Sequence, residues 1–212
     1  MVLPYLLRRQ DRTKKMHPEY CMPGSFYGPA EGILKEKGKN MPKNLIIFFS
    51  RKGQNYVNGS IVDLPKGNTE IVAEFIQKAV GGDLFEIRTV KDYADDYTQC
   101  TVEAKEELRD GARPELKEML TDISSYDNVF VCGPCWWGTY PCAVFTQLEA
   151  LDFTGKNVFP VMTHEGSGLA GAPSALKKYC KGATVGKGLA IHGADAALSE
   201  STVSAWAGKN LA

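Results

Sequence analysis

One segment, residues 44–73, constrains the fold most because it joins an apolar strand to a helix. Residues 45–49 form an unbroken apolar run that stops at Ser50, and helical periodicity begins after Gly67. An unbroken apolar run is typical of a strand buried on both faces of a parallel sheet. A helix that follows such a strand is the usual crossover to the next parallel strand. We therefore expect a ligand to bind at the turn between these two elements.

The start of this helix has the chemistry of an anion site. The first backbone N–H groups of a helix have no intrahelical partner and carry a partial positive charge. Gly67 allows close approach to the backbone, and Asn68 and Thr69 add side-chain donors. Phosphate is a common ligand of such a turn. The same residues also fit an ordinary N-cap and turn, so this segment alone leaves both interpretations open.

Apolar strands alternate with amphipathic helices along the rest of the chain. We expect further strands at residues 84–87, 128–132, 157–162 and 188–192. We expect helices at residues 69–80, 101–110, 142–151, 173–181 and 199–208, and one more that Pro114 opens. The alternation predicts an α/β fold with a five-stranded parallel sheet and helices on both faces.

The loop after the third expected strand, residues 133–141, is rich in aromatic side chains. It contains Trp136, Trp137 and Tyr140, although loops between strands are usually polar. Aromatic rings beside glycines would form an apolar slot for a flat aromatic ligand, with backbone donors at its edge. One of the two tryptophans could instead pack beneath the loop as part of the core.

The loop after the fourth expected strand, residues 163–168, is polar and glycine-rich. Thr163, His164 and Glu165 lie here, and they could reach the same ligand because ligands bind beyond the carboxyl ends of parallel strands. His164 is also consistent with a loop residue that only forms hydrogen bonds. The three histidines of the chain are scattered among different expected elements, so we expect neither a metal site nor a catalytic residue.

Charge and hydropathy exclude several classes of function. The chain has 25 basic and 25 acidic residues, of which residues 41–212 hold 17 and 21. A mildly acidic body argues against a nucleic-acid partner. No apolar run approaches the roughly 18 residues of a membrane span, and the apolar run at residues 2–7 precedes its arginines, unlike an export signal. We therefore expect a cytoplasmic protein with no membrane partner and with its six cysteines mostly reduced.

Two parts of unequal length are expected. Residues 1–42 show no sustained periodicity and are punctuated by glycine and proline, so we expect an N-terminal extension that is disordered or packed on the surface. Residues 43–212 are expected to form the ligand-binding domain.

Taken together, these motifs resemble those of the flavodoxin family, and in particular its clostridial-type branch. The resemblance rests on a strand that ends in Ser50, the turn at residues 67–70, the Trp-Trp-Gly-Thr loop and the Thr-His-Glu-Gly-Ser-Gly loop, and it covers about residues 43–208. It implies a doubly wound sheet of order 2-1-3-4-5 and noncovalently bound flavin mononucleotide (FMN). It also implies electron transfer between redox partner proteins by a monomer or homodimer.

The resemblance assigns the cofactor site residue by residue. Ser50, Gly67, Asn68 and Thr69 would hold the phosphate of FMN, and the two loops would border its isoalloxazine ring. The complete set of expected cofactor-binding residues is Ser50, Lys52, Asn55, Gly67, Asn68, Thr69, Pro134, Trp136, Trp137, Gly138, Thr163, His164, Glu165, Gly166 and Gly168.

The chain departs from the family pattern in ways that leave alternatives open. Residues 51–66 form an insertion that could cover the flavin or be a surface loop, and the body is less acidic than a typical electron carrier. These departures favour a second hypothesis, an FMN-dependent oxidoreductase that takes electrons from NAD(P)H and reduces quinones or similar acceptors. Cys132 and Cys135 form a C-x-x-C pair, so thiol–disulfide exchange is a minor alternative. A phosphorylated receiver domain is rejected because Ser50 and Gly133 stand where it needs acidic residues.

Overall fold

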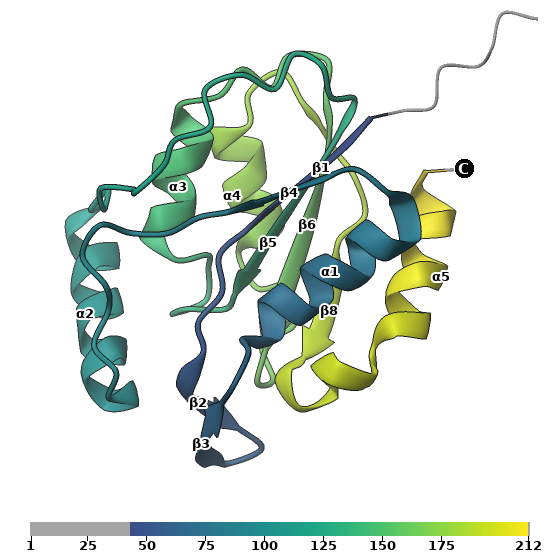
Figure 1. The fold of residues 1–212 in the computed structure, drawn as a ribbon. Coiled ribbons are helices and arrows are strands. Elements are labelled where there is room, and N and C mark those ends of the chain that lie inside the picture. The colour runs from purple at the N-terminus through teal and green to yellow at the C-terminus, as the bar shows by residue number, and fades with distance from the viewer. Residues whose placement is uncertain (1–42, 212) are drawn as a thin grey trace, which may run out of the picture. The chain divides into compact units, whose positions relative to one another are not determined.

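A parallel sheet forms the centre of the part of the chain that the structure describes, residues 43–211. The structure is a computed structural model. The strands of the sheet run in the order β4-β1-β5-β6, with β7 and β8 both beside β6, and all its pairings are parallel. Helices α1 and α5 lie on one face and α3 and α4 on the other (Figure 1). This confirms the predicted α/β fold and the order 2-1-3-4-5, whereas the expected extension at residues 1–42 lies outside the described residues.

The bounds of the elements are as follows. The strands are β1 (Asn44–Phe48), β2 (Gly53–Val57), β3 (Ser60–Leu64), β4 (Asp83–Glu86), β5 (Asn128–Pro134), β6 (Asn157–His164), β7 (Thr184–Val185) and β8 (Leu189–His192). The helices are α1 (Asn68–Val80), α2 (Tyr97–Asp110), α3 (Cys142–Glu149), α4 (Ala172–Tyr179), the 3-10 helix η1 (Gly193–Leu198) and α5 (Glu200–Asn210). No helix in residues 43–211 combines the length and the apolar character needed to cross a membrane.

Strand β1 is apolar after Asn44 because both of its faces are covered. Leu45, Ile47 and Phe49 belong to the core that α3 and α4 help to build, while Ile46 and Phe48 pack with α1 and α5. Successive side chains of a strand point to opposite faces, so a central parallel strand needs an unbroken apolar run.

The fifth position of the sheet is divided between β7 and β8. The two strands pair with the two ends of β6, and Pro160 lies between the paired stretches. A proline has no backbone N–H to donate to a ladder, so the ladder is interrupted there. The connecting glycines also need the space, because a Cβ on Gly186 or Gly188 would lie within 3 Å of Phe159 or Pro160.

The insertion at residues 51–66 is a β-hairpin, which was not predicted. Strands β2 and β3 pair antiparallel around Asn58 and Gly59, which both have positive φ angles, of 49° and 86°. Asn-Gly is the preferred pair for such a two-residue turn. Both strands are only partly buried, so the pattern around this turn lacks a clear apolar face.

The helix expected to begin at Pro114 is absent, and this prediction was wrong. The segment runs alongside the chain after β4 instead: Val90 donates its backbone N–H to the carbonyl of Glu115, and Lys117 donates to the carbonyl of Arg88. These tertiary partners take the backbone groups that a helix would have paired internally.

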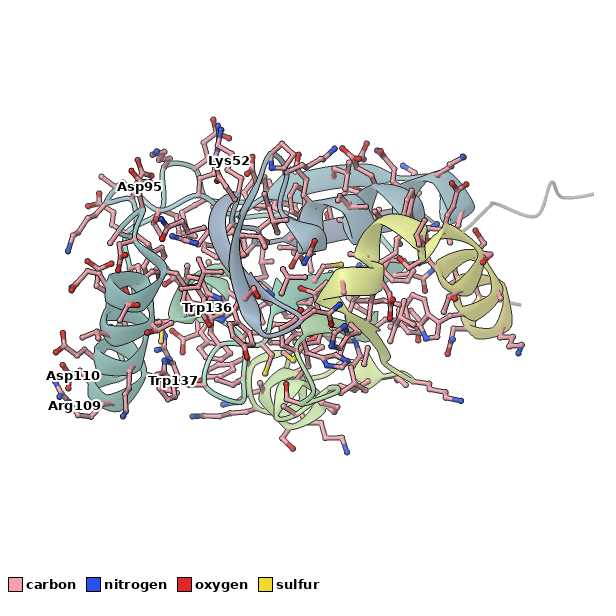
Figure 2. All side chains as sticks on the ribbon, turned by 90° about the horizontal axis from the view of Figure 1, so that it is seen from below. Lys52, Asp95, Arg109, Asp110, Trp136 and Trp137 are labelled. Carbon is pink, nitrogen blue, oxygen red and sulfur yellow. The ribbon has the colours of Figure 1, made fainter. Side chains whose placement is uncertain are left out.

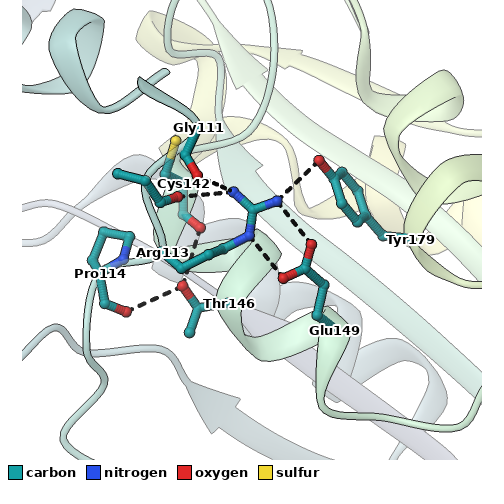
Figure 3. Close-up of polar contacts among 8 residues, drawn as sticks. Gly111, Arg113, Pro114, Cys142, Thr146, Glu149 and Tyr179 are labelled. Carbon is teal, nitrogen blue, oxygen red and sulfur yellow. Dashed lines mark hydrogen bonds and ion pairs between the residues drawn. The ribbon is translucent and has the colours of Figure 1, made fainter. Parts of the chain in front are cut away.

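Side chains fix the same segment to α3 and α4. Arg113 donates both to the Glu149 carboxylate, at 2.8 Å, and to the Tyr179 hydroxyl, and the Thr146 hydroxyl donates to the carbonyl of Pro114 (Figure 3). The guanidinium of Arg113 also donates to the carbonyls of Gly111 and Ala112. The extended path therefore gives hydrogen-bond partners to the Arg113 guanidinium and the Thr146 hydroxyl. Helix propensity alone does not predict these tertiary contacts.

An asparagine ladder joins the beginnings of three strands. Asn128 donates its side-chain amide to Asn44 at 2.8 Å and accepts from the amide of Asn157 at 3.0 Å.

We expect Asn128→Ala to lower the free energy of unfolding by about 2 kcal/mol, because it leaves the buried Asn44 oxygen without its donor. Chemical denaturation measures this. Asn157→Ala is the comparison: it removes a donor to Asn128 at an exposed position, where water can enter, so a smaller loss is expected; equal losses in the two variants would contradict the prediction.

Candidate functional site

The carboxyl ends of β1, β5 and β6 open into one pocket, here called the first pocket. Its volume is about 140 Å3. Nine of the residues predicted from the sequence line it: Ser50, Asn55, Asn68, Thr69, Pro134, Trp136, Thr163, His164 and Glu165. The three predicted segments therefore meet at the edge of the sheet where ligands bind in doubly wound folds.

Gly67 makes the start of α1 possible in its observed position. The Ser50 hydroxyl accepts the backbone N–H of Glu70 at 3.0 Å, which brings the end of β1 against the helix. A Cβ on residue 67 would lie 2.1 Å from the Ser50 Oγ and 2.7 Å from the carbonyl oxygen of Arg51. Only glycine fits between them, so Gly67 contributes by close approach although it does not line the first pocket.

Donors remain at this helix start. Within residues 43–211 the backbone N–H groups of Asn68 and Thr69 form no hydrogen bond. The Thr69 hydroxyl lies 2.7 Å from the Thr163 hydroxyl, and both side chains are buried. This bond fixes α1 to the end of β6. An anion at this end of the first pocket would meet backbone donors at the positive end of a helix dipole.

The loop after β6 supplies a small cluster of titratable groups. Glu165 accepts the backbone N–H of Asn58 at 3.0 Å and lies 3.5 Å from the His192 Nε2. Partial burial and the neighbouring His192 ring lower the pKa of His164, whose Nδ1 accepts the N–H of Gly166. At the end of β6, His164 thus forms a hydrogen bond and also lines the first pocket, so its part in binding a ligand stays a prediction.

The two tryptophans have different surroundings. Trp136 packs edge-on against Phe49 and Tyr93, with ring centroids 5.3 and 5.0 Å apart, and also lines the first pocket. Trp137 is 51% exposed and points to α2, where its indole N–H donates to the carbonyl of Thr101 at 2.9 Å. Figure 2 shows Trp137 beside α2 and Trp136 nearer the middle of the molecule. The prediction that one tryptophan packs as core fits Trp136.

The β2–β3 hairpin forms one wall of the first pocket. Asn55 and Tyr56 line the pocket, and the Tyr56 ring stacks on the ring of Tyr97 at a centroid distance of 6.2 Å. The Gln54 side chain accepts the N–H of Tyr97, and Glu165 holds the turn of the hairpin on the other side. Hydrogen bonds thus join the hairpin to the start of α2 and to the loop after β6, and the insertion lines the first pocket.

A second pocket, of about 400 Å3, adjoins the first. The two pockets share a wall made of Arg51, Asn55, Tyr97, Cys135 and Trp136. The rest of the second pocket consists of Cys100, Thr101 and Ala104 from α2 and of Trp137.

Several predicted site residues lie outside the first pocket. Trp137 lines the second pocket, Gly67 lies behind Ser50, and Lys52, Gly138, Gly166 and Gly168 line neither pocket. Five residues that were not among the expected cofactor-binding residues also line the first pocket: Arg51, Tyr56, Tyr97, Cys135 and Gly193. Of these, Tyr56 belongs to the insertion that was expected either to cover the flavin or to be a surface loop, and Cys135 belongs to the C-x-x-C pair. The Asn58-Gly59 turn could have revealed the hairpin that carries Tyr56, whereas nothing in the sequence places Tyr97 or Gly193 beside it.

The C-x-x-C pair is divided between the two faces of the sheet. Cys132 belongs to the core beneath α1 and α5, whereas Cys135 packs on the core of the opposite face, and both are free thiols. Burial raises the pKa of the Cys132 thiol well above its usual range. An inert, buried thiol on the far side of the sheet does not favour exchange chemistry.

The residues of the first pocket fit an anionic aromatic ligand. Backbone donors at α1 suit a phosphate group, and Trp136 and Tyr56 provide aromatic surface at a distance from those donors. A Cβ on Gly193 would lie 2.8 Å from the Asn68 amide nitrogen and 2.1 Å from the Glu165 carboxylate, so glycine keeps this wall open. Within residues 43–211 no group of His, Cys, Asp or Glu side chains is arranged to hold a metal ion.

The chain is similar in fold to several solved structures. A putative flavoprotein from Bacteroides uniformis ATCC 8492 is 29% identical, with 78% of this chain and 97% of that chain covered and a TM-score of 0.61. A putative flavoprotein from Bacteroides eggerthii DSM 20697 is 27% identical, with 80% and 98% covered and a TM-score of 0.64. A flavoprotein from Lactobacillus acidophilus NCFM, solved in complex with FMN, shares the fold at 18% identity, with 75% and 97% covered and a TM-score of 0.53.

A comparison with curated proteins gave no match. The family model described as Flavodoxin matches residues 63–210, which include most of α1 to α5 and both loops of the site. The clostridial-type branch stays a prediction. With its sheet order, its pocket and this match, the chain belongs to the flavodoxin family.

Proposed function

We propose that this protein binds FMN in the first pocket and transfers electrons between redox partner proteins. The observation that carries the proposal is the start of α1: the backbone N–H groups of Asn68 and Thr69 form no hydrogen bond within residues 43–211, and both residues line a pocket to which Tyr56, Tyr97 and Trp136 add aromatic surface. A flat aromatic ligand that carries a phosphate matches both features, because the phosphate can accept from the N–H groups and the ring can pack on the aromatic side chains. The relative from Lactobacillus acidophilus was solved with FMN, which supports the choice of ligand.

Each wall of the first pocket would have a distinct task. Asn68, Thr69 and the adjoining amides would bind the phosphate, with Ser50 and Gly67 keeping the helix start in place. Trp136, Pro134 and the loop after β6 would border the ring, and the hairpin would cover it. The first pocket is smaller than the roughly 300–1,000 Å3 of typical small-molecule sites, so we expect the hairpin to move when FMN enters.

FMN supplies the electron-transfer chemistry, and the protein sets its potential through stacking, polarity and hydrogen bonds. Glu165 and the apolar surface of Trp136 both line the first pocket, with the Glu165 carboxylate close to Asn68. Both disfavour an added negative charge, so we expect them to destabilise the fully reduced, anionic cofactor and to favour one-electron transfer.

A titration of the purified protein with FMN, followed by visible absorbance, tests the proposal. The protein is expected to bind FMN with saturation and to shift its spectrum. A protein that leaves the FMN spectrum unchanged at saturating concentrations contradicts the proposed function.

The phosphate assignment has its own test. We expect the double variant Asn68→Ala, Thr69→Ala to weaken FMN binding about tenfold, because two phosphate donors are removed. Riboflavin, which lacks the phosphate, should lose much less. Fluorescence titrations with both flavins measure the difference, and equal losses would place the phosphate elsewhere.

A second candidate function is an FMN-dependent oxidoreductase that uses NAD(P)H. The charge of the chain favours it, because residues 41–212 hold 17 basic and 21 acidic residues, whereas an electron carrier that docks basic partners is usually more strongly acidic. Rapid reduction of the bound flavin by NADPH alone would support the oxidoreductase. Reduction only by a partner protein or by dithionite would support the carrier.

A further inference from the structure

One carboxylate, that of Glu165, lies beside the donors at the start of α1. A Cβ on Gly193 would be 2.1 Å from the Glu165 Oε1 and 2.8 Å from the Asn68 Nδ2, so both atoms lie close to the same point of the wall. Among residues 43–211, Glu165 is the only acidic side chain that lines the first pocket. A phosphate bound by Asn68 would therefore lie near a group of its own charge.

No lysine or arginine of residues 43–211 neutralises this carboxylate. The partner of Glu165 is the imidazole of His192, whose Nε2 lies 3.5 Å from the Glu165 Oε2. Arg51 also lines the first pocket, but its guanidinium donates to three backbone carbonyls. Like charges repel most strongly where water is partly excluded, so the Glu165 carboxylate lowers the affinity of the first pocket for a phosphate.

The same carboxylate holds the tip of the β2–β3 hairpin. Its Oε2 accepts the backbone N–H of Asn58 at 3.0 Å. Within the described part of the chain, this is the only hydrogen bond that joins the hairpin turn, residues 57–60, to a residue outside the hairpin. The His192 imidazole approaches the same oxygen, so Glu165 has a second partner within reach when the bond to Asn58 breaks.

We propose that Glu165 competes with the phosphate of the ligand at the start of α1, an inference that rests on the proposed FMN site. In the free protein the carboxylate lies beside the anion donors and holds the hairpin closed through Asn58. A phosphate at Asn68 repels the carboxylate, which turns to His192 and releases the Asn58 N–H. The hairpin tip then moves away and enlarges a pocket of about 140 Å3. Glu165 thus couples phosphate binding to opening of the hairpin.

Glu165→Gln tests the competition, because glutamine keeps an acceptor for the Asn58 N–H and removes the charge. The affinity for FMN is expected to rise about tenfold, since a like charge near the phosphate is lost. Riboflavin, which has no phosphate, should keep its affinity within about twofold. Glu74→Gln is the matched control: it removes the same charge from an exposed side chain of α1 outside the first pocket and should change neither affinity. Fluorescence titrations with both flavins measure these affinities.

Hydrogen exchange of the Asn58 amide in the FMN-free protein tests the opening without any flavin. The probe is inorganic phosphate, and sodium chloride at the same ionic strength is the reference. Phosphate is expected to speed exchange in the turn of the wild-type protein several-fold, because the bond from Asn58 to Glu165 is lost. In Glu165→Gln no charge is repelled, so phosphate should leave the exchange of the turn unchanged.

The other outcomes are also decisive. An affinity for FMN that falls or stays the same in Glu165→Gln overturns the proposal, and so does turn exchange that phosphate does not alter in the wild-type protein. If Glu165→Gln does not fold, Glu165→Ala takes its place: it should bind FMN more tightly than the wild type and exchange the Asn58 amide rapidly with or without phosphate. A wild-type protein whose turn responds to phosphate but that never binds FMN refutes the proposed function and leaves the competition between Glu165 and phosphate intact.

Discussion

Gly67→Ala is expected to reduce the affinity for FMN about 100-fold or more. The added methyl group would overlap the Ser50 Oγ at 2.1 Å and the backbone carbonyl of Arg51 at 2.7 Å. The serine side chain could rotate, but the backbone carbonyl could not move without shifting the end of β1. The start of α1 would have to retreat, and the bond from Glu70 N–H to Ser50 would break. Isothermal titration with FMN measures the loss.

Gly208→Ala is the matched control for this substitution. Gly208 lies within α5, and a Cβ there would meet nothing within 4 Å. Replacing a helical glycine with alanine lowers the entropy of the unfolded chain, so this variant should bind FMN normally and be slightly more stable. If Gly67→Ala bound FMN as tightly as Gly208→Ala, the helix start would not be the phosphate site.

The sequence predicts those parts of the site that depend on strand order. Ser50, Thr69, Trp136 and Thr163 are far apart in the chain, yet each lies at the end of a strand of the parallel sheet, just after one, or at the start of the helix that follows one. The carboxyl ends of parallel strands meet at one edge of the sheet, so periodicity alone brings these residues together. The fold was predictable for the same reason.

Side-chain direction and tertiary pairing could not be predicted in this way. Trp137 has a positive φ of 51° within a tight turn, which directs its side chain to α2 rather than into the first pocket. The segment after Pro114 pairs with the chain after β4, and no local sequence pattern predicts this pairing. Tyr97 reaches the site only because Gln54 and Tyr56 of the hairpin contact it. Such contacts depend on the packed structure and not on local propensity.

The other substitutions with large expected effects concern Trp136 and Trp137, because these two adjacent side chains have different surroundings. Trp136 closes the core against Phe49 and Tyr93 and also forms the wall shared by both pockets. Trp137 holds the loop to α2 through Thr101 and through Lys105, whose ammonium lies 4.8 Å from its ring centroid. The contact of Trp137 with Lys105 is exposed to solvent, so it stabilises the protein much less than the core packing of Trp136 does.

We expect Trp136→Ala to lower the free energy of unfolding by about 3 kcal/mol and to abolish measurable FMN binding, since it removes core packing and the aromatic wall together. Trp137→Ala should cost about 1 kcal/mol and change FMN affinity little, because it loses one exposed hydrogen bond and no contact with the first pocket. Denaturation and FMN titration of both variants measure the two effects. A larger loss of FMN affinity in Trp137→Ala than in Trp136→Ala would show that the flavin ring lies against Trp137, as the resemblance to the family implies. The comparison therefore decides which face of the tryptophan loop the flavin uses.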